Sequence, residues 1–298
     1  MEKQKIAIGV DIGGTSIRVG IVGADGVPIG IIKSIPTNAQ CSPTKIVNNF
    51  VRLLVEVWKE AQVYEIQGIG IGCTGPIDNE RGIILDVANL PTLKNYPLKE
   101  RLLKDFKTNI VFDNDANDYI LGEAVYGAGQ NASSVLGFTL GTGLGCAFVD
   151  SGKIKQGTTG CFGEIWTSPY KNSIIEDYVS GKAISKSYNQ LVGKVCSATE
   201  VAELARKGNH RAIETWNMFA ADLAYVLSWT VNMTDPAVVV LGGSLVKSAD
   251  LFLEKTDKLF RQYISSPLVN TVLLKTALLG DYAGVIGAAL SVINSTEE

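Results

Sequence analysis

The sequence is poor in histidine and cysteine and has no long apolar run. His210 is the single histidine among 298 residues, which excludes a metal site built from several imidazoles and does not favour a Ser-His-Asp triad. The five cysteines are scattered without C-x-x-C spacing, which predicts reduced thiols in a cytoplasmic protein. No apolar run reaches the roughly 20 residues of a membrane span, and the charged start MEKQK does not predict a signal peptide.

The sequence also lacks an excess of positive charge. It carries 27 Lys and Arg against 30 Asp and Glu, so no general positive field exists to hold nucleic acid. We therefore expect neither nucleic acid nor a membrane among its partners. A hydrophobic fraction of 46% and a charged fraction of 19% are typical of a folded chain, and the length allows two domains.

What the sequence does contain is an arrangement of strands and glycine turns that occurs twice. Apolar runs predict strands at 5–10, 17–22 and 29–34, joined by DIGGTS and GADGVP. Residues 134–157 repeat this plan, with TLGTG in the place of DIGGT. Helices and strands then alternate, and they are expected at 43–62, 66–75, 97–107, 109–115, 116–126, 181–193, 199–207, 211–232, 237–241, 248–263, 271–275 and 281–293.

This repetition favours an α/β fold of two duplicated domains that face a cleft. We expect an N-terminal domain of residues 1–115, completed by the C-terminal helix 281–298, and a larger domain of residues 116–280. Ser197 and Glu200 match a capping box at the start of a helix in the larger domain.

Three glycine turns are candidates for binding phosphate: Asp11–Thr15, Gly141–Gly145 and Gly242–Ser244. Glycine lets backbone N–H groups approach an anion, and a threonine hydroxyl can add a donor. Asp11 would repel phosphate by itself, but it fits if Mg²⁺ lies between, because Mg²⁺ prefers oxygen ligands. Any one of these turns is more simply explained as a tight turn, whereas three of them, two in repeated positions, favour phosphate.

Two better-known phosphate motifs do not explain these turns. The sequence contains no G-x-x-x-x-G-K-[ST], so it is not a P-loop protein. Residues 70–75 (GIGCTG) match G-x-G-x-x-G, but Pro76 follows instead of a helix. A dinucleotide fingerprint needs strand, turn and helix in succession, so we reject it.

Carboxylates and amides cluster in VFDNDAND, residues 111–118, where a strand is expected to end and a helix to begin. A single Asp at a helix N-terminus is most often a cap. Five polar residues are more than one cap needs. Asn114 could orient a substrate hydroxyl while Asp115 accepts its proton, as phosphoryl transfer to an alcohol requires. Glu164 and Glu176 could accept hydrogen bonds from a polyol, although each alone is more typical of a solvated surface.

Together these motifs resemble the ROK family of sugar kinases over nearly the whole chain and in the family's order. The matching segments are DIGGTSIRVGIV, GIGCTGPID, ANLP, NDANDYILGE, LGTGLGCAFV and VVLGGSL. The resemblance implies the duplicated actin-like, ribonuclease H-like ATPase fold. It also implies ATP-dependent phosphorylation, with Mg²⁺, of a hexose or hexose derivative, by default at the 6-hydroxyl.

The resemblance implies a role for each matching residue. Asp115 would be the general base, Asn114 would hold the sugar hydroxyl, and Asp11 would organise Mg²⁺ through water. The residues implied to bind the sugar are Gly75, Asn89, Asn114, Asp115, Glu164 and Glu176. The residues implied to bind ATP are Asp11, Gly13, Gly14, Thr15, Gly141, Thr142 and Gly143 on the phosphate side and Gly242 and Gly243 on the nucleoside side.

One departure from the family pattern bears directly on function. Glu164 matches the family's G-E-x-G-H element, but Thr167 stands at its histidine and no cysteine cluster follows. Structural zinc is therefore not expected. The missing histidine also removes an expected sugar contact, which leaves open whether the acceptor is a free hexose, an N-acetylhexosamine or a glycoside.

Three alternatives remain beside the kinase. A sugar-responsive transcriptional regulator of the same family would need a DNA-reading segment before the first strand, which is expected to start by residue 5. An actin-like ATPase without a sugar would not need Asn114 and Asp115 together with the two glutamates. A non-catalytic sugar binder is disfavoured by the intact Asp115 and Asp11. A homodimer or larger homo-oligomer is expected from the resemblance alone.

Overall fold

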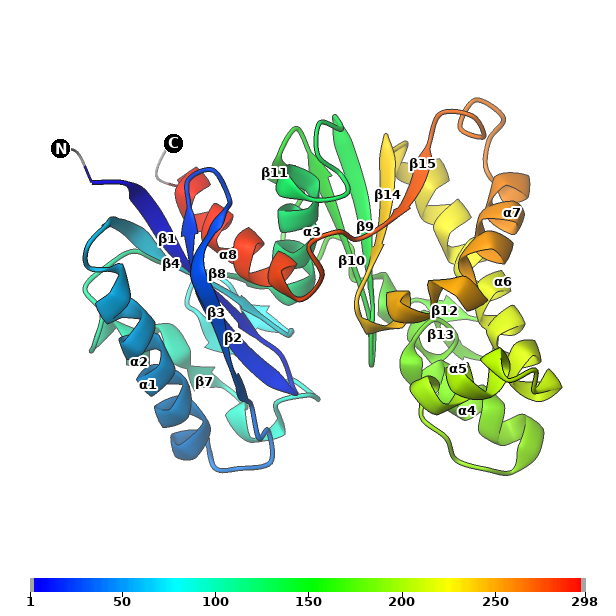
Figure 1. The fold of residues 1–298 in the computed structure, drawn as a ribbon, viewed down its shortest axis with the longest axis horizontal. Coiled ribbons are helices and arrows are strands. Elements are labelled where there is room, and N and C mark those ends of the chain that lie inside the picture. The colour runs from blue at the N-terminus through cyan, green and yellow to red at the C-terminus, as the bar shows by residue number, and fades with distance from the viewer. Residues whose placement is uncertain (1–2, 296–298) are drawn as a thin grey trace. The chain divides into compact units, whose positions relative to one another are not determined.

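The computed structural model describes residues 3–295, which form two compact units (Figure 1). The first unit contains the residues up to Gly127 together with those from Asp281 onward, and the second unit runs from Ala128 to Gly280. No helix within residues 3–295 is long and apolar enough to cross a membrane.

Helix α3 (Asp115–Tyr126) lies in the first unit, whereas the sequence analysis began the second domain at residue 116. The reason is its close contact with α8 (Ala283–Ser295). A Cβ at Gly287 would collide with the backbone of Asp118, and a Cβ at Gly122 would collide with the backbone of Ala283. Glycine at these two positions lets the helices cross at short range, so α3 packs as part of the first unit.

The first unit is built on a five-stranded sheet in the order β3-β2-β1-β4-β8. Its strands are β1 (Lys5–Ile12), β2 (Ser16–Gly23), β3 (Pro28–Pro36), β4 (Glu65–Cys73) and β8 (Ile110–Asn114). β1 to β3 are antiparallel neighbours, while β4 and β8 run parallel to β1. The other elements are α1 (Pro43–Ala61), α2 (Leu98–Leu103), the short strands β5 (Ile77–Asp78), β6 (Ile83–Ile84) and β7 (Tyr96–Pro97), and the 3-10 turns η1 (Pro91–Leu93) and η5 (Gly280–Tyr282).

Alternate residues of β1 face opposite sides of this sheet, as the pleat requires. Ile8 and Val10 lie in the core that also contains the apolar face of α1, whereas Ala7 packs with Val285 of α8. A Cβ at Gly9 would collide with the carbonyl oxygen of Val285. The glycine therefore lets α8 lie directly on the sheet, close to the strand that ends in Asp11.

The second unit repeats the sheet of the first. Its order is β11-β10-β9-β14-β15, with β9 (Ser134–Leu140), β10 (Leu144–Asp150), β11 (Lys153–Ile154), β14 (Val238–Gly242) and β15 (Leu273–Thr276). β9 to β11 are antiparallel neighbours, and β14 and β15 run parallel to β9. Because strand order and direction are the same in both sheets, the duplicated α/β plan predicted from the sequence is confirmed.

The helices of the second unit mostly follow the predicted boundaries. They are α4 (Gly181–Val192), α5 (Ala198–Arg206), α6 (His210–Thr234) and α7 (Leu253–Tyr263), with the hairpin β12 (Pro169–Tyr170) and β13 (Ser173–Ile174) and the 3-10 turns η2 (Ile165–Thr167), η3 (Ile175–Asp177) and η4 (Ser244–Leu251). The capping box of Ser197 and Glu200 is confirmed. The helix expected from residue 248 instead begins at Leu253, because Ser248 has non-helical dihedrals (φ −117°, ψ 24°).

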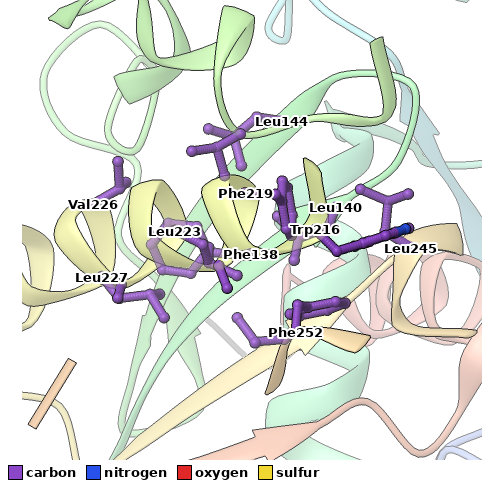
Figure 2. Packing of buried hydrophobic residues seen from close by; sticks show 14 of the residues in the cluster. Phe138, Leu140, Leu144, Trp216, Phe219, Leu223, Val226, Leu227, Leu245 and Phe252 are labelled. Atoms are coloured by element: carbon purple, nitrogen blue, oxygen red, sulfur yellow. The ribbon is translucent and has the colours of Figure 1, made fainter. Parts of the chain in front are cut away.

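The core of the second unit includes the residues on either side of the Gly141–Gly143 turn. Leu140 and Leu144, which flank this turn, belong to the same buried cluster as Trp216 and Phe219 of α6 and Phe252 (Figure 2). Trp216 stacks on Phe252 with ring centroids 5.8 Å apart. The two residues that flank the Gly141–Gly143 turn are therefore anchored in a core that contains buried aromatic side chains.

Candidate active site

The predicted residues of the first unit lie at one edge of its sheet, where β1, β4 and β8 end. Asp11 of β1 is paired in register with Gly72 of β4, and Gly72 is paired with Asp113 of β8. The carboxyl ends of parallel strands form the usual binding edge of an α/β sheet. The structure thus brings Asp11, the turn that follows it and the Asn114-Asp115 pair to the same edge.

The turn of Gly13–Thr15 is closed by its own backbone and lies against a predicted sugar residue. Gly13 N–H donates a hydrogen bond to the Ser16 carbonyl at 3.0 Å. A Cβ at Gly14 would lie 2.9 Å from the Cβ of Asn89 and 3.0 Å from its carbonyl oxygen. Glycine is therefore required where the predicted phosphate turn meets Asn89, and the threonine of the turn is exposed.

Asp11 forms an ion pair with Arg18, which lies opposite it on β2. Arg18 Nη1 donates to Asp11 Oδ2 at 3.0 Å, and Arg18 Nη2 lies 3.4 Å from Asp281 Oδ1. Burial raises the pKa of the Asp11 carboxyl above its ordinary value, and the Arg18 guanidinium opposes this rise. Arg18 was not predicted as a site residue, although its position directly across the predicted hairpin from Asp11 was the available signal.

Asn114 is the N-cap of α3, and Asp115 occupies the first helical position. Asn114 Oδ1 accepts a hydrogen bond from the Ala116 N–H at 2.8 Å, and Asp115 Oδ1 accepts from the same N–H at 2.9 Å. Asp115 is half-buried, and the helix dipole favours its ionised form. A Cβ at Gly75 would lie 2.8 Å from Asn114 Nδ2, so the predicted sugar loop passes directly beside this amide.

The buried carboxylate of Asp113 accepts hydrogen bonds from residues around the junction of β8 and α3. Its Oδ1 accepts hydrogen bonds from Asn114 N–H at 2.7 Å, from Asn117 Nδ2 at 2.8 Å and from Asn79 Nδ2 at 3.3 Å. Three donors on one oxygen satisfy a carboxylate that is only 4% exposed. The sequence showed a polar cluster here, but it did not show that Asp113 and Asn117 support the turn that carries Asp115.

The pKa values of two buried groups in the first unit, Cys73 and Asp118, are raised in part by nearby carboxylates. Burial raises the pKa of the Cys73 thiol well above its ordinary value, and the Asp115 and Asp11 carboxylates raise it further. Burial and then Asp113 raise the pKa of Asp118, whose Oδ1 accepts a hydrogen bond from Ser291 Oγ at 2.9 Å. Asp11 and Asp115 therefore both act on the same end of β4.

In the second unit, the turn of Gly141–Gly143 lies beside the end of β14 and the start of α4. The first N–H of the turn donates to the carbonyl of its third residue at 3.0 Å, and its first carbonyl accepts from Gly181 N–H at 2.8 Å. A Cβ at Gly243, where φ is 83°, would collide with the backbone at the end of β9. The predicted phosphate turn and the Gly242-Gly243 turn thus lie together, and Thr142 is exposed.

Glu176 lies at this same turn. Its Oε2 accepts a hydrogen bond from the Leu144 N–H at 3.0 Å. Its carboxylate also fills the space that a Cβ at Gly143 would need. A carboxylate predicted on the sugar side is therefore held against a turn predicted on the phosphate side.

Glu164 directly precedes the 3-10 turn η2 and follows Gly163, which lies against β10. Gly163 packs so closely on the backbone of Cys146 that a Cβ there would collide with its carbonyl. Burial, and then the Glu164 carboxylate, raise the pKa of the Cys146 thiol to about 12. Trp166 Nε1 donates a hydrogen bond to Glu164 Oε2. Trp166, next to Thr167, was not predicted as a site residue, although its indole N–H supplies a donor within the same element.

The donor set of the first unit fits a Mg²⁺ that is held mainly by nucleotide phosphates. Within residues 3–295, no three His, Cys, Asp or Glu side chains gather as a metal-binding group. Asp11 supplies one carboxylate beside the glycine turn, and Mg²⁺ bound through substrate phosphates needs only one or two. The predicted absence of structural zinc stays a prediction.

The two sheets define a class, the duplicated actin-like ATPase fold, as predicted. A sequence model of the ROK family matches residues 7–295, and the chain belongs to this family. It is 29% identical to a glucokinase of Thermotoga maritima over 97% of both chains, and 30% identical to an N-acetyl-D-glucosamine kinase of Vibrio parahaemolyticus over 94% of this chain and 97% of that one. A ROK family glucokinase from Streptomyces griseus, solved with glucose and AMPPNP, is 26% identical and has a TM-score of 0.81 over 97% of this chain and 99% of that chain.

Proposed function

We propose that this ROK-family chain, an ATP-dependent sugar kinase, phosphorylates a hexose or hexose derivative at the 6-hydroxyl, with Asp115 as the general base. The observation that carries the proposal is the position of Asp115 at the start of α3, on the strand edge that also carries Asp11 and the Gly13–Thr15 turn. Similarity to a glucokinase and to an N-acetyl-D-glucosamine kinase supports a hexose-type acceptor without favouring either sugar.

Asp115 accepts the proton of the acceptor hydroxyl while that oxygen forms its bond to the terminal phosphorus of ATP and ADP leaves. The Ala116 N–H and the helix dipole favour the anion, which is the form that a base needs. Asn114 Oδ1 is engaged by the same N–H, so we assign its Nδ2, beside Gly75, to the acceptor oxygen. General-base assistance of this kind contributes about 10²- to 10⁴-fold to the rate.

The two glycine turns are assigned to the ATP phosphates. The first N–H of each turn closes the turn itself, so the contacts fall to the later residues: Gly14, Thr15, Thr142 and Gly143. Asp11 would hold Mg²⁺ through water, and the ion supplies neutralisation of the charge on the phosphoryl group. Gly242 and Gly243 are assigned to the nucleoside.

The sugar contacts are assigned to Gly75, Asn89, Glu164 and Glu176. A carboxylate suits this task because it can accept hydrogen bonds from two neighbouring hydroxyls. Glu176 also accepts from Leu144 N–H at the second glycine turn. Sugar binding at Glu176 would therefore bear on the geometry of the phosphate turn.

A screen coupled to ADP release tests the function with glucose, mannose, fructose, allose, N-acetylmannosamine, N-acetylglucosamine and cellobiose. We expect ADP release that depends on at least one sugar, and a phosphorylated 6-position by NMR. ATP hydrolysis without any dependence on sugar would favour an actin-like ATPase instead. Light scattering on the same sample tests the expected homodimer or larger homo-oligomer.

Asp115→Asn tests the general base. We expect sugar binding by calorimetry to remain and kcat to fall by about 10²-fold or more. The matched control is Asp86→Asn, which removes an exposed carboxylate of the same unit that pairs with Lys94. Near-normal turnover in Asp115→Asn would remove Asp115 from this role.

A further inference from the structure

A hairpin between Glu164 and Glu176 is fastened to helix α6 in the second unit. β12 and β13 pair antiparallel, and the Ile175 N–H donates to the Ser168 carbonyl at 3.0 Å at the base of the hairpin. Glu176 follows the hairpin almost at once, and Glu164 precedes it by a single 3-10 turn. Glu164 and Glu176 therefore flank the hairpin in the chain, one on each side of it.

Asp222 of α6 is the residue to which the hairpin side chains bind. It is 7% exposed, and its Oδ1 accepts hydrogen bonds from Tyr170 Oη at 2.9 Å and from Lys171 Nζ. A buried carboxylate needs such donors, because an unpaired buried charge is unfavourable. Burial, and then the Asp222 carboxylate, raise the pKa of Tyr170, so its hydroxyl stays protonated and remains a donor at neutral pH.

The hairpin residues also stack on one another and on α6. Lys171 Nζ lies 5.2 Å from the ring centroid of Tyr170 and 4.9 Å from that of Tyr178. The Tyr170 ring stacks on Tyr225 of α6 at 5.4 Å. Lys171 has a left-handed backbone (φ 51°) at the first position of the two-residue turn that joins β12 and β13, where tight hairpin turns require a positive φ. The turn therefore presents the Lys171 side chain to Asp222 and to the two rings.

We infer that Tyr170, Lys171 and Asp222 form a clasp that positions Glu164 and Glu176 for the sugar. This inference rests on the proposed sugar-kinase function. With the clasp closed, Glu176 stays on Leu144 N–H, and Trp166, packed on the core, keeps its hydrogen bond to Glu164. With the clasp open, both carboxylates lose a common support, while Asp115 in the first unit keeps all of its own contacts.

Lys171→Met and Tyr170→Phe test the clasp, because each keeps the apolar body of the side chain and removes the group that binds Asp222. We expect faster hydrogen exchange over residues 163–178 and a KM for D-glucose, or for the panel sugar phosphorylated fastest, raised about 10-fold. The KM for ATP should rise less than the KM for the sugar, since Gly14 and Thr15 lie outside the clasp and Glu176 touches only the second phosphate turn. Lys171→Arg should restore the sugar KM, because a guanidinium can make the same ion pair and ring contacts.

Asp250→Asn is the matched control. It breaks the ion pair with Arg206, whose two hydrogen bonds of 2.7 and 2.9 Å lie in the same unit, and it should leave both KM values unchanged. An unchanged sugar KM in Lys171→Met and Tyr170→Phe would overturn the inference, and so would unchanged exchange over 163–178. A wild-type protein that phosphorylates no sugar would instead overturn the proposed function, and the exchange comparison would still show whether the clasp holds the hairpin.

Discussion

Arg18 Nη1 lies 3.0 Å from Asp11 Oδ2, so the carboxylate proposed to organise Mg²⁺ already has a cationic partner on the neighbouring strand. Burial by itself favours the neutral form of Asp11, and Arg18 counteracts this. An ionised Asp11 is the form that suits a cation. Arg18 therefore limits the rise in the pKa of Asp11 that burial causes, and so favours the charged carboxylate.

Arg18→Met should make activity more sensitive to acid. Without the guanidinium, the pKa of Asp11 rises further, so a smaller fraction of the protein has the ionised carboxylate at a given acidic pH. We expect kcat/KM to fall several-fold more at pH 6 than at pH 8, with the acid limb of the profile moved to higher pH. Arg206→Met, which breaks a pair distant in sequence from these residues, should leave the profile unchanged. An unmoved acid limb in Arg18→Met would contradict the role given to Arg18.

Gly143→Ala should separate activity from stability. The new Cβ would occupy the space of the Glu176 carboxylate, and a carboxylate is the flexible end of its side chain. We expect the free energy of unfolding to change by less than about 1 kcal/mol, because the side chain can swing away. The displaced Glu176 should lower kcat/KM by roughly 10- to 100-fold, measured by steady-state kinetics over both substrates.

Gly9→Ala is the comparison for Gly143→Ala, because its new Cβ meets backbone and not the end of a flexible side chain. Here the new Cβ meets the carbonyl oxygen of Val285 in the backbone of α8, which cannot swing away. Overpacking of this kind costs about 1–3 kcal/mol or more, so urea unfolding should show a clear loss of stability. Equal losses of stability in the two variants would show that Glu176 is not free to move.

Trp166→Phe should weaken sugar use selectively. Phenylalanine keeps an aromatic ring against the core but cannot donate to Glu164 Oε2. Glu164 is exposed and has further interactions, so we expect a modest rise of roughly 3- to 10-fold in the sugar KM, with the KM for ATP unchanged. A sugar KM equal to that of the wild-type protein would show that the indole N–H does not position Glu164.

The sequence was sufficient for the architecture because its signals are local and periodic. The pattern of strand, glycine turn and strand in residues 5–22 recurs in residues 134–150. Each of the two segments forms a hairpin at the same position in its own sheet, and the two sheets have the same strand order. The Asn114-Asp115 pair was singled out because a polar run at a strand end has no role in an apolar core, and the structure has it at the start of α3. These features depend on neighbours in the chain.

The supporting contacts could not be predicted, since they join residues far apart in sequence. Asp222 is some fifty residues from its partners Tyr170 and Lys171, and Ser291 is 173 residues from Asp118. Neither hydrophobic period nor turn chemistry carries such pairings. The same limitation explains the boundary at 116, because the contact of α3 with α8 decides to which unit that helix belongs.

Asp118 should make the stability of the protein decline as the pH rises. Its pKa is raised by burial and by Asp113, so the folded state holds this proton more tightly than the unfolded state does. A group with a raised folded pKa contributes least above that pKa. Stability therefore falls with pH from the unfolded value, about 4, up to the folded pKa of Asp118, with a slope of at most about 1.4 kcal/mol per pH unit for one proton.

Asp118→Asn removes this titration with little change of shape. Ser291 can still donate to the remaining oxygen, and among the described residues Asp118 Oδ2 has no hydrogen-bond partner to lose. We expect the stability of the variant relative to the wild-type protein, measured by urea unfolding between pH 5 and pH 8, to increase with pH up to the folded pKa of Asp118. Asp250→Asn should show no such trend: the pKa of Asp250 is lowered by Arg206, so its stabilising charge is already fully present above about pH 4 and the stability difference should stay constant over this range. A stability difference for Asp118→Asn that is flat across this range would mean that Asp118 is already ionised in the folded protein, despite its burial beside Asp113.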